Sequence, residues 1–513
     1  MEASLNYDRT FNDDHRVSAL FLFNQQSKLL YPKGTLEDAI PYRMMGIAGR
    51  ATYSWKDRYF AEFNIGYNGA ENFSPKHRFG TFPAFGVGWV VSNEKFWQPL
   101  SKAVSFLKIR YTDGKVGNSE VSDRRFMYLD QMKENGDYGY KFGPNGTKWA
   151  GYETVNMAVD LIWEESRKQD LGIDLKLFND DLSIVFDLFK ERRENILLKR
   201  EHSMPSFLGY NTSAPYGNIG IIENKGFDGT IEYNKRINKD WVIALRGNVT
   251  FNKDKWIQGE LPEQKYEWMN QYGRNINGAK GYVAEGLFTQ AEIDDMARWE
   301  SLSAANKAIT PKPFASQFGT VKAGDIKYKD LNNDGQIDAY DQTYISRGDV
   351  PTTVYGFGFT VGWKDLSVGM MFQGVAGAER VLNGSSINPF NGGGGSGNLY
   401  SNIDDRWTPE NPRQDVFWPR MGDKAVANNE QASTWWLRDM SFLRLKNLEL
   451  GYTLPQRWTT KIGIRGCRLF ARGTNLLTFS NFKLWDPELE TTDGLRYPQM
   501  KSVSVGFSIN FNN

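Results

Sequence analysis

A strict two-residue alternation near the C-terminal end constrains the fold of this chain more than any other feature. In residues 501–511, KSVSVGFSINF, the apolar side chains Val503, Val505, Phe507, Ile509 and Phe511 alternate with Ser, Gly and Asn. Successive side chains of a β-strand point to opposite faces, so this segment predicts a strand with one apolar and one polar face. Such a strand suits a soluble β-sandwich. It also suits a membrane barrel that is apolar toward lipid and polar toward its interior.

The same alternation recurs along the chain, in residues 241–251 and in residues 357–363. Further strands are predicted at residues 16–23, 43–55, 59–67, 84–91, 107–117, 171–178, 182–189, 226–236, 366–374, 443–452 and 464–474. An Asn-Asp-Asp turn at residues 179–181 and a Lys-Asp turn at residues 364–365 predict two hairpins. The segments indicate roughly fourteen to sixteen strands and an antiparallel all-β fold.

Short turns alternate with long connections between the predicted strands. The long connections cover residues 118–152, 195–225, 252–350 and 378–440. Outer-membrane barrels have short turns at one membrane surface and long loops at the other, whereas unstructured loops of this length are uncommon in soluble domains. The pattern therefore favours an antiparallel transmembrane β-barrel with long extracellular loops, one of which covers residues 253–350.

Aromatic residues near the predicted strand ends agree with a barrel. Trp55, Tyr59, Trp89, Trp363 and Tyr452 occupy such positions, as in the aromatic girdles that flank the apolar band of membrane barrels. The alternative is that they are ordinary core aromatics, and no single residue decides between the two interpretations.

Charge and composition exclude several other classes of protein. The chain has 62 basic and 61 acidic residues, a balance that argues against a nucleic-acid partner. The three histidines, His15, His77 and His202, are far apart in sequence, so a histidine-rich zinc site is not expected. The single cysteine, Cys467, lies in a predicted strand as a small buried or lipid-facing side chain, and it forms no intrachain disulfide. We expect neither a signal peptide nor a transmembrane helix in this sequence.

One loop of the long connection has the spacing of a calcium site. In residues 329–341, KDLNNDGQIDAYD, the predicted metal-ligating residues are Asp330, Asn332, Asp334, Gln336, Asp338 and Asp341. They occupy positions 1, 3, 5, 7, 9 and 12 of a twelve-residue EF-hand-type loop, with Gln336 offering its backbone carbonyl. Gly335 stands at position 6, which must turn sharply, and Ile337 follows as an apolar anchor. The alternative is an Asx-rich turn without an ion. No second EF-hand loop is evident, so a structural Ca²⁺ is expected rather than a calcium switch.

Several segments resemble the SusC/RagA-type TonB-dependent outer-membrane transporters of Bacteroidetes. They are FPAFGVGWVVSNEKF at 82–96, FLKIRYTDGKVGN at 106–118, NKGFDGTIEY at 224–233, GDIKYKDLNNDGQIDAYDQTYI at 324–345, RWTPENP at 406–412, SFLRLKNLELGYTLP at 441–455, NLLTFSNFKLWDPE at 475–488 and the final strand. They follow the order of the family from one end of the chain to the other, so the resemblance covers nearly all of the sequence.

The resemblance implies a transporter that is not an enzyme. Members have a plugged barrel of about 22 strands, and they import oligosaccharides or peptides with a SusD-like surface lipoprotein and with energy delivered through TonB. Nothing here resembles the signal peptide, the TonB box or the plug of the family. We therefore expect residues 1–513 to be the C-terminal part of such a barrel in the outer membrane, unable to transport actively on its own.

Two other functions are compatible with the residues alone. The first is a soluble all-β calcium-binding protein, either carbohydrate-active or an adhesin, and the second is a passive pore without a plug. Substrate-binding residues are unknown. Loop tryptophans are candidates for ligand contact, with packing of the loops as their alternative role: Trp149, Trp256, Trp268, Trp299, Trp407, Trp418, Trp435 and Trp436. The glycine run at 392–395 is interpreted as a loop tip and not as a phosphate-binding loop.

Overall fold

A computed structural model describes residues 1–29, 39–120, 125–205, 207, 214–384, 387–388, 399–422, 424–460 and 463–511. The predicted glycine-rich tip at 392–395 lies outside these residues. The chain forms two compact units, one of residues 1–234 and 250–262 and one of residues 235–249 and 263–513.

Within the described residues, fifteen strands follow one another in a single antiparallel sheet order, β1-β2-β3-β4-β5-β6-β9-β10-β11-β12-β17-β18-β21-β22-β23. Strands that follow one another in this order also follow one another along the chain, apart from the strands that lie in the connections. This up-and-down order confirms the predicted antiparallel all-β fold. The closure of the sheet into a barrel and the total of about 22 strands remain predictions.

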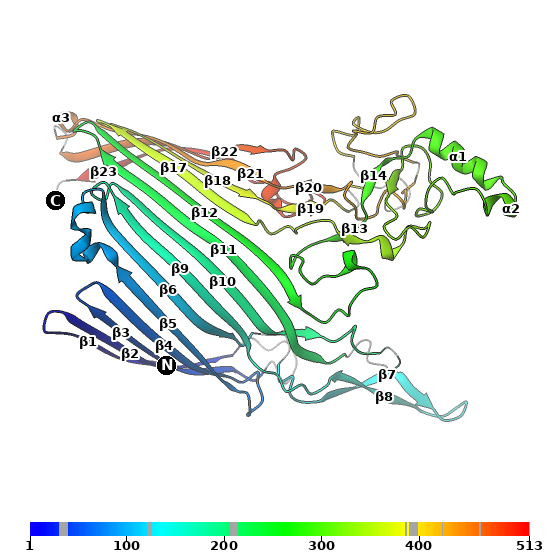
Figure 1. Ribbon diagram of the computed structural model, residues 1–513, viewed down its shortest axis with the longest axis horizontal. Helices are drawn as coiled ribbons and strands as arrows, with labels where there is room; N and C mark the ends of the chain where they lie inside the picture. Colours follow the sequence, from blue (N-terminus) through cyan, green and yellow to red (C-terminus); the bar gives the residue numbers. More distant parts are fainter. Residues whose placement is uncertain are drawn as a thin grey trace. The chain divides into compact units, whose positions relative to one another are not determined.

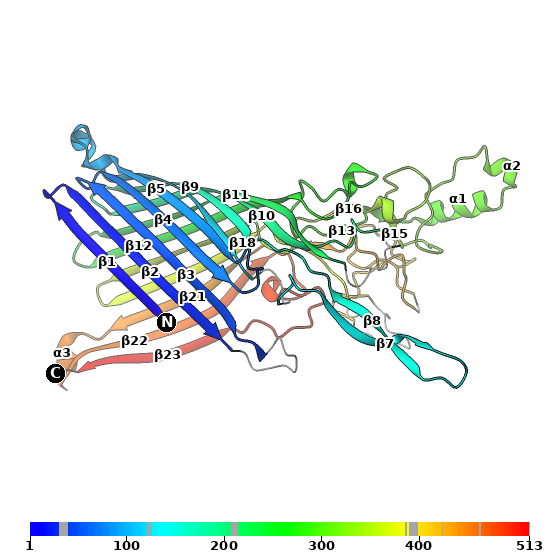
Figure 2. The ribbon, with the colours of Figure 1, turned by 90° about the horizontal axis from the view of Figure 1, so that it is seen from below.

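The first unit contains the strands of the N-terminal half (Figures 1 and 2). They are β1 Glu2–Phe11, β2 His15–Lys28, β3 Tyr42–Trp55, β4 Tyr59–Ala70, β5 Phe79–Val90, β6 Val104–Asn118, β9 Glu164–Leu177, β10 Leu182–Lys199 and β11 Tyr216–Arg236. β12, Trp241–Gln258, contributes residues to both units. The hairpin of β7 Gln131–Lys141 and β8 Lys148–Asn156 extends away from the sheet of this unit.

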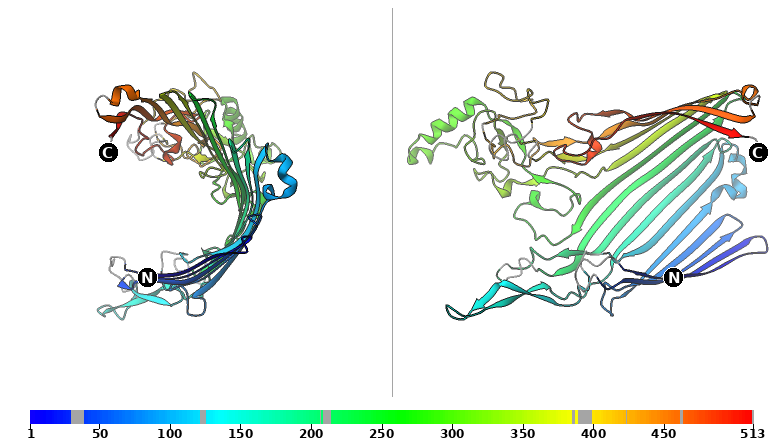
Figure 3. Two further views of the ribbon diagram at one scale, coloured as in Figure 1. Left: turned by 90° about the vertical axis from the view of Figure 1, so that its left-hand side faces the viewer. Right: turned by 180° about the vertical axis from the view of Figure 1, so that it is seen from behind.

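The second unit contains the C-terminal strands and most of the long connections (Figure 3). Its sheet strands are β17 Thr353–Trp363, β18 Leu366–Ala376, β21 Phe442–Thr453, β22 Ile464–Ser480 and β23 Ser502–Phe511. Its connections contain β13 Lys280–Gly281, β14 Ala284–Leu287, β15 Ile326–Tyr328, β16 Thr343–Tyr344, β19 Glu379–Val381 and β20 Leu437–Asp439. Three helices are α1 Gln290–Glu300, α2 Ala304–Lys307 and α3 Gln456–Thr459.

The predicted two-residue alternation separates the sheet of each unit into an apolar and a polar face. On β4 and β5 the apolar side chains Phe63, Phe85 and Val87 are 50, 49 and 53% exposed. Asn64 and Glu62 occupy the alternate positions of β4. Cys467 pairs with Ile509 of β23, so it shares the apolar face of the second unit, in agreement with the sequence prediction.

The predicted aromatic positions gather at the turn ends of the strands. In the first unit, Trp55 stacks on Tyr59 with ring centroids 5.7 Å apart, and Tyr59 stacks on Trp89 at 6.3 Å. In the second unit, Trp363 lies 6.0 Å from Trp241, and Tyr452 pairs with Leu366 beside it. These contacts agree with a girdle at one end of the apolar face.

The two predicted hairpin turns have the backbone conformation of tight turns. The Asn-Asp-Asp turn between β9 and β10 has positive φ at Asn179 and Asp180, and the two-residue turn between β17 and β18 has positive φ at Lys364. Both predicted hairpins are therefore confirmed, because their antiparallel registers are complete.

Some strand boundaries differ from the prediction. β1 was not predicted, although Leu5, Tyr7 and Phe11 alternate with polar residues and only Arg9 interrupts this face; the complete register with β2 shows that it is a strand. β10 extends to Lys199 and β11 begins at Tyr216, so the predicted connection 195–225 is wrong at both ends. β12 extends to Gln258, into the predicted loop 253–350. The predicted connection 118–152 contains β7 and part of β8.

No helix within the described ranges combines the length and the apolar character needed to cross a membrane.

Candidate calcium loop and its supporting platform

The predicted calcium loop begins directly after β15, a three-residue strand in the second unit. β15 pairs with β14 through Ala284 with Tyr328, Gly286 with Lys327 and Leu287 with Ile326. Ile326 and Tyr328 are buried, at 0 and 2% exposure, in an apolar cluster. We call this cluster the loop core; its buried members are Tyr282, Leu287, Ala323, Ile326, Tyr328, Ile337, Ala378, Leu382, Ile387, Trp407, Val416, Trp418, Trp436, Met440 and Phe482. The start of the loop is therefore held in place, because β15 is paired with β14 and packed in the loop core.

Side-chain amides satisfy the other edge of β15. The Ile326 N–H donates to Asn429 Oδ1 at 2.9 Å, and Asn428 Nδ2 donates to the Ile326 carbonyl at 2.7 Å. The Tyr328 N–H donates to Gln317 Oε1 at 3.2 Å. Burial raises the pKa of Tyr328, whose hydroxyl donates to the Asn428 carbonyl at 2.7 Å. A short strand with a buried edge is stable here because amides replace the missing neighbouring strand.

Asp325, immediately before β15, is a fully buried acceptor. Its carboxylate accepts two bonds from the Arg420 guanidinium, from Nε at 2.9 Å and from Nη2 at 3.1 Å. Asn429 Nδ2 donates to it at 3.0 Å, and the Lys322 N–H donates at 2.7 Å. This charge is paired and hydrogen-bonded, as a buried carboxylate requires.

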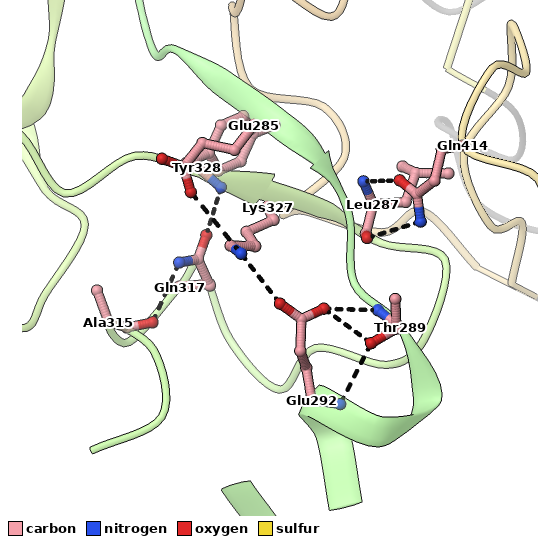
Figure 4. A network of polar contacts seen from close by, with 9 residues as sticks. All are labelled: Glu285, Leu287, Thr289, Glu292, Ala315, Gln317, Lys327, Tyr328 and Gln414. Atoms are coloured by element: carbon pink, nitrogen blue, oxygen red, sulfur yellow. Dashed lines mark hydrogen bonds and ion pairs between the residues drawn. The ribbon is translucent and has the colours of Figure 1, made fainter. Parts of the chain in front are cut away.

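A second polar network joins β15 to helix α1 (Figure 4). Lys327 Nζ lies 3.0 Å from Glu292 Oε1 and 3.8 Å from Glu285 Oε2. Glu292 also accepts from the Thr289 N–H at 2.9 Å and completes a capping box at the start of α1. Burial acts to raise the pKa of Glu292, but the hydrogen bonds from Thr289 and Lys327 outweigh it and hold the pKa below its usual value.

Within the loop, side-chain oxygens accept hydrogen bonds from the loop backbone. Asp330 Oδ2 accepts from the Gly335 N–H at 2.8 Å, and Asp334 Oδ1 accepts from the Gln336 N–H at 2.9 Å. Asp341 is fully buried and accepts from the Leu331 N–H at 2.7 Å and the Asp338 N–H at 2.9 Å. Both carboxylates at the ends of the predicted ligand set, Asp330 and Asp341, thus brace the turn.

The loop conformation explains the remaining pattern residues. Gly335 has φ +84°, which favours glycine. Asn333 also has positive φ, in keeping with the tolerance of Asn for this region. Ile337 is 5% exposed in the loop core, and its N–H donates to the Ser316 carbonyl at 2.8 Å. The sharp turn at position 6 and the apolar anchor at position 8 are confirmed.

Every predicted ligand atom is an oxygen, and hard cations such as Ca²⁺ prefer oxygen ligands. One carboxylate oxygen, Oδ1 of Asp330, is buried without a hydrogen-bond partner. Against this, no three Asp, Glu, His or Cys side chains of the described residues converge as a metal cluster. Asn332 and Asp338 instead bond within the loop, Asn332 to Asp334 and Asp338 to Tyr340. Calcium binding by Asp330, Asn332, Asp334, Gln336, Asp338 and Asp341 therefore remains a prediction.

The chain is similar to known proteins in both sequence and fold. No protein-family profile matches the chain. TonB-dependent receptor P3 of Formosa agariphila is 26% identical over 503 residues, covering 91% of this chain and 45% of that protein. TonB-dependent receptor SusC of Bacteroides thetaiotaomicron is 25% identical over 483 residues, covering 90% of this chain and 43% of SusC. Over at least nine tenths of its length, the chain is similar in sequence to SusC-type TonB-dependent receptors.

The fold of the chain is similar to that of a solved structure. A structure of the RagAB peptide importer in its closed-closed state matches with a TM-score of 0.74 at 21% identity, covering 99% of this chain and 55% of that chain. The chain spans about half the length of the curated relatives it matches. Their names are those of receptors, which agrees with the expectation that this chain is not an enzyme.

The candidate ligand-contact tryptophans differ in burial. Trp407, Trp418 and Trp436 are 7, 1 and 3% exposed in the loop core, where they have the packing role given as the alternative. Trp149 is 68% exposed on the β7–β8 hairpin. Trp268 is partly buried, stacks on Tyr266 at 4.5 Å and donates its Nε1–H to the Tyr340 carbonyl of the calcium loop at 2.8 Å. The sequence does not distinguish these environments, since each tryptophan lies in a long connection.

The residues that support the loop carry no signal in the sequence that predicts their role. Asp325, Arg420, Asn428 and Asn429 come together from positions about 100 residues apart. Neither periodicity nor a local motif marks such pairs. Asp325 does stand inside the segment at 324–345 that carries the family resemblance, which is the only sequence signal near it.

Proposed function

We propose that this chain forms the barrel wall of a TonB-dependent importer in the outer membrane of a Gram-negative bacterium. The importer takes up oligosaccharides or peptides together with a SusD-like surface lipoprotein. The curated relatives support the dependence on TonB and the SusC-type assembly. The RagAB structure, described as a peptide importer, supports a peptide as one of the two substrate classes.

One observation carries the membrane assignment: the apolar face of the sheet is exposed. In a soluble β-sandwich a second sheet covers the apolar face, but Phe63, Phe85 and Val87 are about half exposed here. Contiguous exposed apolar surface of this kind marks contact with lipid or with a partner. In a soluble calcium-binding adhesin or carbohydrate-active protein, such an apolar face would be exposed to water without a function.

The opposite face supports a water-filled or protein-filled interior. On the polar face of the first unit, the Arg110 guanidinium lies 3.2 Å from Asp170, 3.4 Å from Asp174 and 2.5 Å from Asp187. These residues come from β6, β9 and β10. Charged networks on strands that cross a membrane face a lumen and not lipid.

A transport assay tests the importer assignment. The gene that encodes this chain is deleted in its bacterium, and uptake of labelled oligosaccharides and peptides is measured with and without a functional TonB. We expect uptake of one substrate class to be lost in both mutants and restored by the intact gene. Unchanged uptake of both classes would contradict the proposal. Affinity purification of the receptor is expected to recover a lipoprotein encoded beside it.

Cell fractionation separates the membrane protein from the soluble alternative. We expect the chain in the outer-membrane fraction, released by detergent. Recovery as a detergent-free soluble monomer would favour the soluble calcium-binding alternative.

We further propose that the loop of residues 330–341 holds a structural Ca²⁺. Asp330, Asn332, Asp334, Asp338 and Asp341 would supply side-chain oxygens and Gln336 its carbonyl, and the ion would neutralise the carboxylates and stiffen the loop. At Ca²⁺ about 100-fold above its dissociation constant, the folded loop gains about 2.7 kcal/mol. Protease cleavage within residues 324–345 should slow when Ca²⁺ is added.

The double variant Asp330→Ala/Asp334→Ala should abolish this calcium dependence. Asp404→Ala is the control, because Asp404 is almost fully exposed elsewhere in the long connections. Identical cleavage of the unmodified chain with Ca²⁺ and with chelator would show that the loop is an Asx-rich turn that holds no ion.

A further inference from the structure

The apolar face of the first unit changes to a row of basic residues toward the long connections. We call these residues the basic belt: Lys115 on β6, Arg167 on β9, Lys190 and Arg192 on β10, Lys225 on β11, and Lys253 and Lys255 on β12. The pairing registers place Lys115 opposite Arg167 and Lys190 opposite Lys225 on the same face. The belt thus continues across five neighbouring strands of the sheet.

The belt borders an aromatic row directly. The Phe186 and Phe227 rings lie 5.8 Å apart, and the Phe227 and Phe251 rings lie 5.6 Å apart. Because side chains two residues apart share a face, Lys225 is the next apolar-face position after Phe227, and Lys253 is the next after Phe251. Aromatic rings followed at once by cations are the arrangement expected where hydrocarbon gives way to headgroups.

Carboxylates only partly neutralise the basic belt. Glu223 is shared between Lys190 and Lys255, with its oxygens 3.3 Å from each ammonium. Lys225 directly faces Lys190, and like charges opposite each other destabilise a sheet unless a counter-ion lies between them. The three other pairs of the belt are one-to-one: Arg167 with Asp113, Lys115 with Glu165 and Arg192 with Glu194. The excess positive charge therefore lies on β10, β11 and β12.

The turn end of the same face is different. There Lys56 pairs with Asp14 at 3.3 Å and Arg58 pairs with Glu94 at 3.3 Å, so each of these cations has its own carboxylate. The cations that share or lack a carboxylate on the strands themselves therefore lie toward the long connections, where they suit a leaflet with anionic headgroups.

We propose that the basic belt binds the phosphate groups of a phosphorylated lipid in the leaflet next to the long connections. The proposal rests on the proposed function, which places the apolar face in a membrane. Basic side chains beside an apolar surface attract anionic headgroups, and arginine and lysine are the residues that bind phosphate oxygens. The acyl chains of the same lipid pack on the aromatic row, while its phosphates lie between Lys190, Lys225 and Lys253.

Lipid titration of the full chain in detergent micelles tests the proposal. The probes are diphosphoryl lipid A, its dephosphorylated form and inorganic phosphate. The belt variant is Lys190→Gln/Lys225→Gln/Lys253→Gln. The control is Lys108→Gln/Lys168→Gln/Lys176→Gln, which removes equal charge from the polar face of the same unit.

We expect the belt variant to bind diphosphoryl lipid A more weakly, by about fivefold for each lysine and about a hundredfold in all. The control variant should bind within about twofold of the unmodified chain, because its lysines face away from lipid. Dephosphorylated lipid A should bind the unmodified chain as weakly as the belt variant binds the phosphorylated form.

Equal binding by the belt variant, or equal binding of dephosphorylated lipid, would overturn the proposal. Displacement of the lipid by equimolar inorganic phosphate would assign the site to free phosphate and would also overturn it. Far-UV circular dichroism in the same micelles shows whether each variant keeps its strands. A chain that stays soluble without detergent contradicts the proposed function and this proposal together, whereas a micelle-bound chain indifferent to phosphate contradicts this proposal alone.

Discussion

Single polar residues in the second unit have roles that depend on burial and not on charge. Asp325 and Asp404 are both aspartates within 4 Å of an arginine, yet Asp325 is fully buried and the Asp404 side chain is 96% exposed. Exposed ion pairs contribute little to stability, whereas removing one partner of a buried pair leaves an uncompensated charge. The support of the calcium loop therefore depends on Asp325 far more than on the acidic residues at the surface.

The variant Asp325→Asn should destabilise the loop core by about 3–5 kcal/mol, because Arg420 loses its buried carboxylate. Hydrogen exchange of the β15 amides measures this local loss. Asp404→Asn should leave the same amides within about 0.5 kcal/mol of the unmodified chain. Equal exchange in both variants would mean that Arg420 finds another partner and that the Asp325 pair does not hold the loop.

The sequence predicts the long sheet strands well and the short strands of the connections poorly. The long sheet strands follow from alternation, since the period of two is a direct consequence of strand geometry. β1 has the same period, but Arg9 interrupts its apolar face, and the strand is established by its pairing with β2. Likewise β14 and β15 are too short for a pattern. Pairing with each other defines both strands, and hydrogen bonds from residues 317, 428 and 429 hold β15. The loop residues of the candidate site were predicted from spacing, but their supports are distant in sequence and were not.

Helix α1 provides a pH-dependent test at the scale of one element. The pKa of Glu292 is lowered in the folded chain, so its bonds to Thr289 and Lys327 stabilise the start of α1 at pH values above the ordinary value of 4.5. That stability should be lost as the pH falls below 4.5 and through the lowered pKa. Amide exchange at the first turn of α1, followed from pH 6 downward, measures the loss. Glu292→Gln should remove most of the pH dependence of this exchange. An unchanged pH dependence in that variant would mean that another titratable group causes it.

At the scale of the whole molecule, one sequence property connects the fold to the proposed function. The alternation that defines the strands also divides each sheet into an exposed apolar face and a charged polar face. The aromatic stacks at the turn ends and the basic belt at the opposite end of the first unit lie on the apolar face. The calcium loop lies in a long connection and would brace that connection without taking part in any catalysis.

The most direct test of this account is a spin-label scan of β4 in lipid vesicles. Labels are placed one at a time at positions 62–67 of the Cys467→Ser chain, and their accessibility to oxygen, which enters lipid, is compared with that to a water-soluble nickel complex. We predict that positions 63, 65 and 67 are accessible mainly to oxygen, and that positions 62, 64 and 66 are accessible to the nickel complex or protected from both. Equal accessibility of all six positions to the nickel complex would contradict a sheet whose apolar face lies in a membrane.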